Sequence, residues 1–112
     1  MTTKVEAGII REKDELVLMP HNVLVQVKGL EKQGQKVTFG LAGTIVDVGL
    51  KMPSDFDTSS LKKGNVLCDP RYPMKLISSF IARVIIYDIL SPISKGEAIV
   101  VHSYTSKMPG KI

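Results

Sequence analysis

The sequence predicts an all-β protein, and three observations lead to that class. The 112 residues include no tryptophan and only three phenylalanines and three tyrosines, so a core must come mainly from valine, isoleucine and leucine, which favour pleated strands. Apolar residues recur with a period of two or in short runs, and no window shows the spacing of three and four typical of an amphipathic helix. Glycines and prolines divide these runs into short segments.

The first expected strands lie in GIIREKDELVLMP, where the charged turn Arg11–Glu15 separates two short apolar runs and Pro20 ends the second. This pattern predicts a hairpin-like unit. In the following NVLVQVKGL, Val23, Val25 and Val27 alternate with a more polar set, which predicts a strand with one face in the core and one in water.

The middle of the chain predicts further short strands joined by turns. Gly34 marks a polar turn, and Gly40 and Gly43 bracket another turn before a strand over 44–50. The segment KMPSDFDTSS predicts a surface loop, because it combines a proline with hydroxyl and carboxylate side chains. NVLC then predicts a short buried strand, closed by DPRYP, whose two prolines cannot lie inside a central strand.

The pattern changes after this proline pair. SFIARVIIYDIL, residues 79–90, predicts a long apolar strand, and EAIVVHSYT predicts another strand after the connection SPISKG. The chain is therefore expected to form two unequal β units, residues 1–70 and 76–112, joined by a linker at 71–75.

Composition argues against several functional classes. A single cysteine excludes an internal disulfide, and two histidines with one cysteine cannot supply a four-ligand zinc site. The N-terminus lacks the apolar region of a signal peptide, and no apolar run approaches the length of about 20 residues that spans a membrane. No glycine-rich loop matches the phosphate-binding pattern of nucleotide hydrolases. A cytosolic protein without a membrane partner is the expectation.

No catalytic constellation or metal site is predicted. Cys68 lies in an apolar run, where a small buried side chain is more common than a reactive thiolate. The spacing of His21 and His102 nominates no triad, and Asp55 and Asp57 offer fewer oxygens than a cation needs.

The net charge of +4 is concentrated near the C-terminus. Residues 1–70 hold nine basic and nine acidic side chains, whereas residues 71–112 hold six and two. A basic segment of this kind fits RNA or an acidic protein face, although solvated lysines are also an ordinary surface feature. The candidate contacts are Lys62, Lys63, Arg71, Lys75, Lys107 and Lys111.

Four stretches, taken in order, resemble the translational GTPases of the EF-Tu and elongation factor one-alpha superfamily. KVEAGIIREKDELVLMP resembles the family pattern around the second strand of β-barrel domain 2, and LAGTIVDVGL and LKKGNVLCDP resemble later strands of that barrel. FIARVIIYDILSPISKGEAIVVHSYT resembles the first two strands of the following barrel, domain 3. Lys13 stands where the family has a turn glycine, and Thr44 where it has an acidic or amide residue.

The resemblance implies an antiparallel, EF-Tu domain 2-like β-barrel over residues 1–70, lacking its first strand, and the start of a domain 3-like barrel over residues 76–112. SPISKG and VHSYT look most like the ribosome-rescue GTPase of no-go mRNA decay, and the class II release factor and elongation factor one-alpha are alternatives. The implied partners are the ribosome and a Pelota/Dom34-like or release-factor-like protein, with RNA as a further candidate.

This segment of the family carries no catalytic residue and no cofactor. GTP and Mg are implied only for a G domain outside this sequence, so the chain itself is expected not to be an enzyme. The competing class is an independent small β-barrel that binds RNA through its basic and aromatic side chains. An enzyme built on Cys68 is a third alternative.

Overall fold

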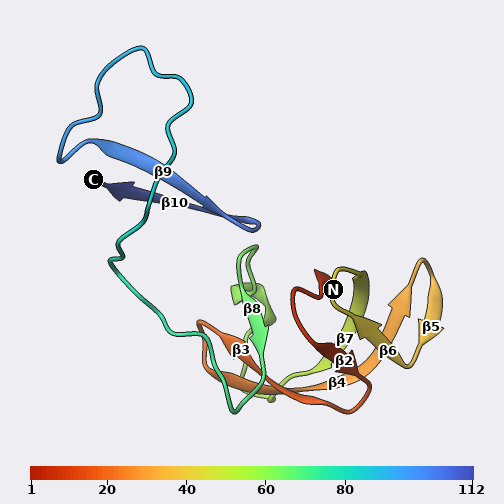
Figure 1. Cartoon of the computed structure of the whole chain (residues 1–112). Helices are drawn as coiled ribbons and strands as arrows, with labels where there is room; N and C mark the ends of the chain where they lie inside the picture. The colour runs from red at the N-terminus through yellow and green to blue at the C-terminus, as the bar shows by residue number, and fades with distance from the viewer.

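The computed structural model describes all 112 residues and confirms the all-β class (Figure 1). The strands are β1 Thr2–Lys4, β2 Ile9–Arg11, β3 Glu15–Met19, β4 Val23–Lys32, β5 Gln35–Val37, β6 Phe39–Leu41, β7 Ile45–Lys51, β8 Val66–Cys68, β9 Ala98–Ser103 and β10 Ser106–Lys111. One short 3-10 helix, η1 Thr58–Ser60, is the only helical element. No helix in the chain is long or apolar enough to cross a membrane.

The strands form three antiparallel sheets. The main sheet has the order β1-β7-β4-β3-β8, and β5 pairs with the end of β4. Strands β2 and β6 form a small second sheet, and β9 and β10 form a third. The curved arrangement of the strands before residue 70 is consistent with the EF-Tu domain 2-like barrel expected from the sequence.

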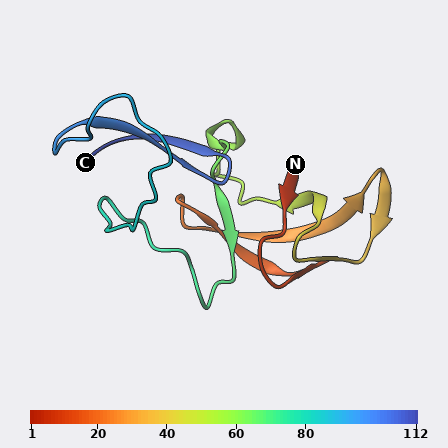
Figure 2. The same ribbon diagram turned by 45° about the horizontal axis from the view of Figure 1, so that its top comes forward.

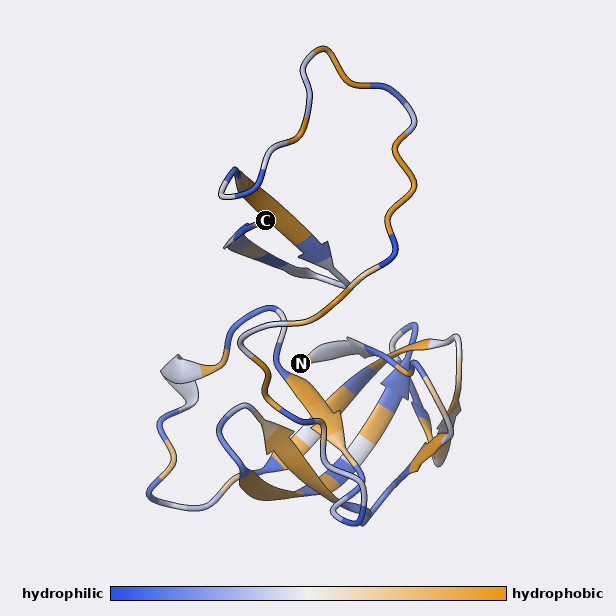
Figure 3. Ribbon diagram, turned by 60° about the vertical axis from the view of Figure 1, so that its left-hand side comes forward, coloured by the Kyte–Doolittle hydropathy of each residue, from blue (hydrophilic) through white to orange (hydrophobic).

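The core lies along β4 and the neighbouring β7, and its alternation on β4 is the one that the sequence pattern predicts. Val25 and Val27 of β4 are buried, whereas Leu24, Gln26 and Lys28 between and beside them are exposed. Leu30 is fully buried and packs in one cluster with Val5, Ile10, Val27, Val46 and Val48. Figure 3 shows these apolar stretches along the strands of the first two sheets, and further ones along the segment that leads to β9.

The expected hairpin around Arg11–Glu15 is wrong, because β2 and β3 do not pair with each other. β2 pairs with β6, whereas β3 pairs with β4 and β8. The intervening turn directs the chain from one sheet into another: the Asp14 carboxylate accepts the Arg11 amide at 2.8 Å. The amide of Lys13 donates to the carbonyl of Val27 in β4 at 2.8 Å, so the turn is fastened to β4.

The loops and turns largely match their sequence signals. Gln33 and Gly34 join β4 to β5 with positive φ angles of 52° and 78°, the combination that two-residue hairpins favour. The expected loop after β7 contains only η1, whose N-cap Asp57 accepts the Ser59 amide at 2.9 Å. The Ser59 hydroxyl also donates to the Asp57 carboxylate at 2.7 Å, and these two hydrogen bonds, chiefly the one from the hydroxyl, lower the pKa of Asp57 below its ordinary value.

The expected strand over 79–90 is also wrong. Residues 73–93 make no backbone hydrogen bond, and most of their apolar side chains, including Phe80, Ile81 and Tyr87, are exposed. Residues 79–90 have the composition of a strand, but β9 and β10 pair only with each other. No neighbouring strand therefore forms hydrogen bonds with this segment. A strand requires a partner for its backbone groups as well as a favourable local sequence.

The C-terminal residues form a separate β-hairpin. β9 and β10 pair in continuous register from Ser103↔Ser106 at the tip to Ala98↔Lys111 at the open end. Tyr104 occupies the tip with a φ of 52°, and Gly96 closes the open end by donating its amide to the Ile112 carbonyl at 2.6 Å. Figure 2 shows the tip of this hairpin beside the turn that precedes β8.

Candidate nucleic-acid and partner interface

Lys62 and Lys63 lie on a tight turn at the start of β8. The Asn65 amide donates to the Lys62 carbonyl at 3.2 Å, and Gly64 adopts a φ of 98° in the third position of this turn. Glycine adopts that conformation without the steric penalty that a side chain imposes. The turn therefore presents two adjacent lysine side chains to solvent, and both are exposed.

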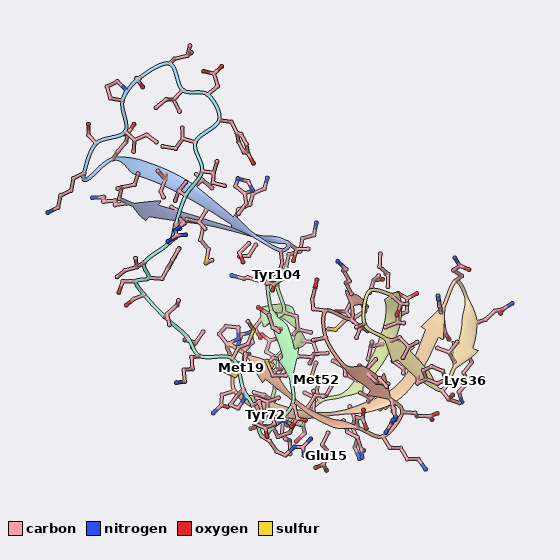
Figure 4. All side chains as sticks on the ribbon, viewed as in Figure 1. Glu15, Met19, Lys36, Met52, Tyr72 and Tyr104 are labelled. Carbon is pink, nitrogen blue, oxygen red and sulfur yellow. The ribbon has the colours of Figure 1, made fainter.

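The tip of the β9–β10 hairpin packs directly against this turn. A side chain carbon added to Gly64 would lie 2.8 Å from the Cβ of Ser106 and 2.9 Å from its Oγ. Lys63 and Lys107 are the chain neighbours of these two contacting residues. Figure 4 shows Tyr104, which is 75% exposed, at this same junction above the upper end of β8.

The structure thus brings three of the six candidate basic residues to one junction. Lys62, Lys63 and Lys107 form no ion pair, and all three are exposed. We call this set, together with Tyr104 at the hairpin tip, the junction surface. Exposed lysines without a carboxylate partner on two segments that meet contribute a positive potential that suits a phosphate backbone or an acidic protein surface.

Arg71 lies at the other end of β8 and is engaged by its own carboxylate. Its Nη2 lies 2.8 Å from Oδ2 of Asp69 and its Nε lies 3.1 Å from Oδ1. Hydrogen bonds from the Arg71 side chain and backbone lower the pKa of Asp69 to about 2, and the pair raises the pKa of Arg71. Part of the positive charge of Arg71 is therefore neutralised locally.

Arg71 and Lys75 share an open hollow of about 620 Å³ with apolar neighbours. The Arg71 guanidinium carbon lies 5.8 Å from the centre of the Tyr72 ring, within the range of a cation–π contact. Met19 and Tyr72 lie near each other on this side of the molecule in Figure 4. This hollow combines a paired arginine, a lysine and exposed apolar atoms, which suits a protein side chain better than a bare phosphate.

Lys111 is not part of either cluster. It lies opposite Ala98 at the open end of the hairpin, five residues along β10 from Ser106. At about 3.4 Å per residue this is roughly 17 Å along the strand. Lys111 is therefore the candidate contact that the structure separates from the rest.

The other chemically versatile residues have structural surroundings. Cys68 is buried in β8 and lies opposite Val17 of β3. Nε2 of His21 lies 3.3 Å from Nδ2 of Asn65, and the His21 ring meets the Phe56 ring edge to face at 5.4 Å. His102 is exposed opposite Lys107. No group of three or more potential metal ligands comes together.

Sequence reasoning missed two features of this region. It did not predict the contact of Ser106 with Gly64, because the two residues are far apart in the chain and small side chains carry no pairing signal. It also missed the contacts of His21 with Asn65 and Phe56, which hold the loop after β7 beside β8. The Asp69–Arg71 pair did have a signal, since an aspartate before proline often bonds the backbone two residues on.

No family model matches the chain, but known proteins do. Elongation factor 1-alpha of Cenarchaeum symbiosum is 26% identical over 94% of the chain. The GTP-binding subunit of the eukaryotic peptide chain release factor of Zygosaccharomyces rouxii is 29% identical over 92% of it. Elongation factor 1-alpha of Absidia glauca is 31% identical over 96% of it.

The chain spans only part of each of these proteins. It corresponds to 23% of the length of the two elongation factors and to 15% of the release-factor subunit. The four sequence stretches, the antiparallel β architecture and these similarities agree with one another. They identify the chain as a relative of one segment of the translational GTPases, the family of elongation factor 1-alpha and the release-factor GTP-binding subunit.

Proposed function

We propose that the chain acts as a non-catalytic β-barrel segment of a cytoplasmic translation GTPase and docks on the ribosome and on a tRNA-like partner protein. The observation that carries this proposal is the similarity of 92% or more of the chain to one segment of proteins named as an elongation factor and a release-factor subunit. In this proposal residues 1–70 are the domain 2-like barrel, 71–75 the linker and 76–112 the start of the domain 3-like barrel.

The junction surface is the proposed contact with ribosomal RNA. Lys62, Lys63 and Lys107 are exposed and unpaired, so each can approach a phosphate and release a bound counterion. Such contacts position a protein on RNA without reading its sequence. The hollow beside Arg71 and Lys75 is the proposed contact with the partner protein, and Lys111 lies outside both.

The proposed partner is a Pelota-like protein, with a release-factor-like protein as the alternative. The segments SPISKG and VHSYT favour the ribosome-rescue branch of the family, whereas the relatives identified by comparison are elongation factors and release-factor subunits. GTP and Mg belong in this proposal to a G domain of the parent factor. The affinity of the chain for each of the two partner proteins separates the branches. The Arg71→Gln variant, which is altered at the proposed partner contact, serves as the control.

Salt-dependent binding to ribosomes tests the proposed RNA contact. The double variant Lys62→Gln/Lys63→Gln removes two charges from the junction surface, and Lys28→Gln/Lys36→Gln removes two exposed lysines of β4 and β5 as a matched control. Co-sedimentation with ribosomes at graded salt should show the slope of log affinity against log salt falling by about 2 for the first variant. Equal slopes for the two variants would contradict the assignment.

An independent RNA-binding module remains the second candidate function. The exposed Tyr104 at the tip of the lysine-bearing hairpin favours it, because single-stranded bases stack on aromatic rings within a positively charged surface. Binding of a short single-stranded RNA that is lost in Tyr104→Ala, without any affinity for ribosomes, supports this candidate over the first.

A further inference from the structure

The position of the β9–β10 hairpin depends on very few contacts. The hairpin forms its own sheet, and no hydrogen bond or ion pair joins it to residues 1–72. Residues 73–93, which lead from the first part of the chain to the hairpin, make no backbone hydrogen bond. No hydrogen bond or ion pair therefore orients the hairpin, and the close approach is made at its tip.

That approach is made by Gly64 and Ser106. Real Cβ atoms essentially never lie within 3.0 Å of a neighbouring atom, and a Cβ at Gly64 would lie 2.8 Å from the Cβ of Ser106. The turn and the hairpin tip can meet at this distance only because residue 64 has no side chain. Gly64 and Ser106 are both partly buried, whereas the lysines that precede or follow them in the chain, Lys63 and Lys107, are exposed.

We infer that the Gly64–Ser106 contact is the docking point that fixes the hairpin against the first sheet and completes the junction surface. Gly64 and Ser106 are positioning residues in this inference, since their contact places the turn that carries Lys63 against the hairpin tip that carries Lys107, without contacting the ligand. The RNA-binding part rests on the proposed function, whereas the docking itself does not.

The chain offers a matched control for the obvious variant. Gly64→Ala introduces both a steric clash and the strain of an alanine at a φ of 98°. Gly34→Ala introduces similar strain, at a φ of 78°, but its added carbon meets no atom within 4 Å. Comparison of the two isolates the clash with Ser106 from the backbone effect.

A compensating variant tests the contact directly. Because the clash at Gly64 is with the side chain of Ser106, removal of that side chain in Gly64→Ala/Ser106→Gly should relieve it. The nearest remaining atom, the Cα of residue 106, lies 3.5 Å from the added carbon, which is an ordinary contact distance. Ser106→Leu provides the reverse test, since it overfills the contact from the hairpin and leaves the first sheet unchanged.

The experiment is ¹⁵N relaxation of the intact chain, which reports whether β4 and the hairpin tumble as one body. The unaltered chain and Gly34→Ala should show common tumbling, Gly64→Ala and Ser106→Leu should lose it, and the compensating double variant should regain it. Unchanged amide shifts in β4 and β7 confirm that each variant folds. If Gly64→Ala unfolds the first sheet, Ser106→Leu alone decides the result.

Three outcomes overturn the inference: independent tumbling in the unaltered chain, common tumbling in Ser106→Leu, or, provided that Gly64→Ala folds, no recovery in the double variant. Ribosome binding is measured separately on the same proteins. If the inference and the proposed function both hold, Ser106→Leu lowers the salt slope by about 1, because Lys107 leaves the site. If Gly64→Ala and Ser106→Leu lose common tumbling but the unaltered chain does not bind ribosomes, the proposed function is refuted. The inference about the docking point then still holds.

Discussion

Lys13 holds a backbone conformation that suits glycine, and its replacement by glycine should stabilise the protein. Its φ is 71°, in the left-handed region where a Cβ crowds the following carbonyl oxygen. The turn cannot relax, because the Lys13 amide donates to the Val27 carbonyl at 2.8 Å and the Asp14 carboxylate accepts the Arg11 amide. Lys13 is exposed and forms no ion pair, so glycine removes only the strain.

The expected gain follows from two opposing contributions. A non-glycine residue in the left-handed region costs about 1 to 2 kcal/mol. Glycine loses more conformational freedom on folding, which costs about 0.5 to 1 kcal/mol. Lys13→Gly should therefore raise the free energy of unfolding by about 0.5 to 1 kcal/mol. This corresponds to an increase in Tm of roughly 2 to 8 °C for a small domain.

Urea denaturation followed by circular dichroism measures this change at constant slope. Lys36→Gly is the matched control, because it removes the same exposed side chain from β5, where φ is not positive. That variant should lose about 0.5 to 1 kcal/mol, the ordinary cost of glycine in a strand. A Lys13→Gly protein that is destabilised as much as Lys36→Gly would refute the strain argument.

Two further predictions concern the core and the acid range. Leu30→Ala should cost about 2 to 5 kcal/mol in urea denaturation, because Leu30 is fully buried, whereas Leu24→Ala on the same strand should cost less than about 0.5 kcal/mol. Asp69 has a folded-state pKa of about 2, below its ordinary value of 3.8, so its contribution to stability is present above pH 4 and is lost as the pH falls towards 2. Carboxyl NMR should follow that titration directly, and Arg71→Gln should move the midpoint up towards the ordinary value. An unshifted midpoint in Arg71→Gln would show that the guanidinium does not hold the carboxylate.

The sequence predicted those elements whose signal is local. The alternation around Val25 and Val27 predicted which face of β4 is buried, and the glycine at Gly34 predicted the turn into β5. These predictions succeed because the period of a strand and the φ of a turn are properties of a few neighbouring residues.

Strand pairing was not predicted, because each partner lies far along the chain. β2 pairs with β6 and not with β3, although β2 and β3 flank a short charged turn. Residues 79–90 have a stronger strand composition than β1 or β5, yet they remain unpaired. A strand forms its backbone hydrogen bonds with another segment of the chain, and the strand's own residues do not predict whether such a segment is available.

The amino-acid sequence by itself determined the all-β class, the buried face of β4, the turns and the presence of exposed lysines in the last half of the chain. Only the tertiary structure decided which of those lysines lie together. The turn that carries Lys62 and Lys63 meets the hairpin tip beside Lys107 because Gly64 admits Ser106 at a distance that any side chain would forbid, whereas Lys111 is held at the other end of the same hairpin. Charge is a property of each residue, but a charged surface depends on backbone contacts between distant parts of the chain.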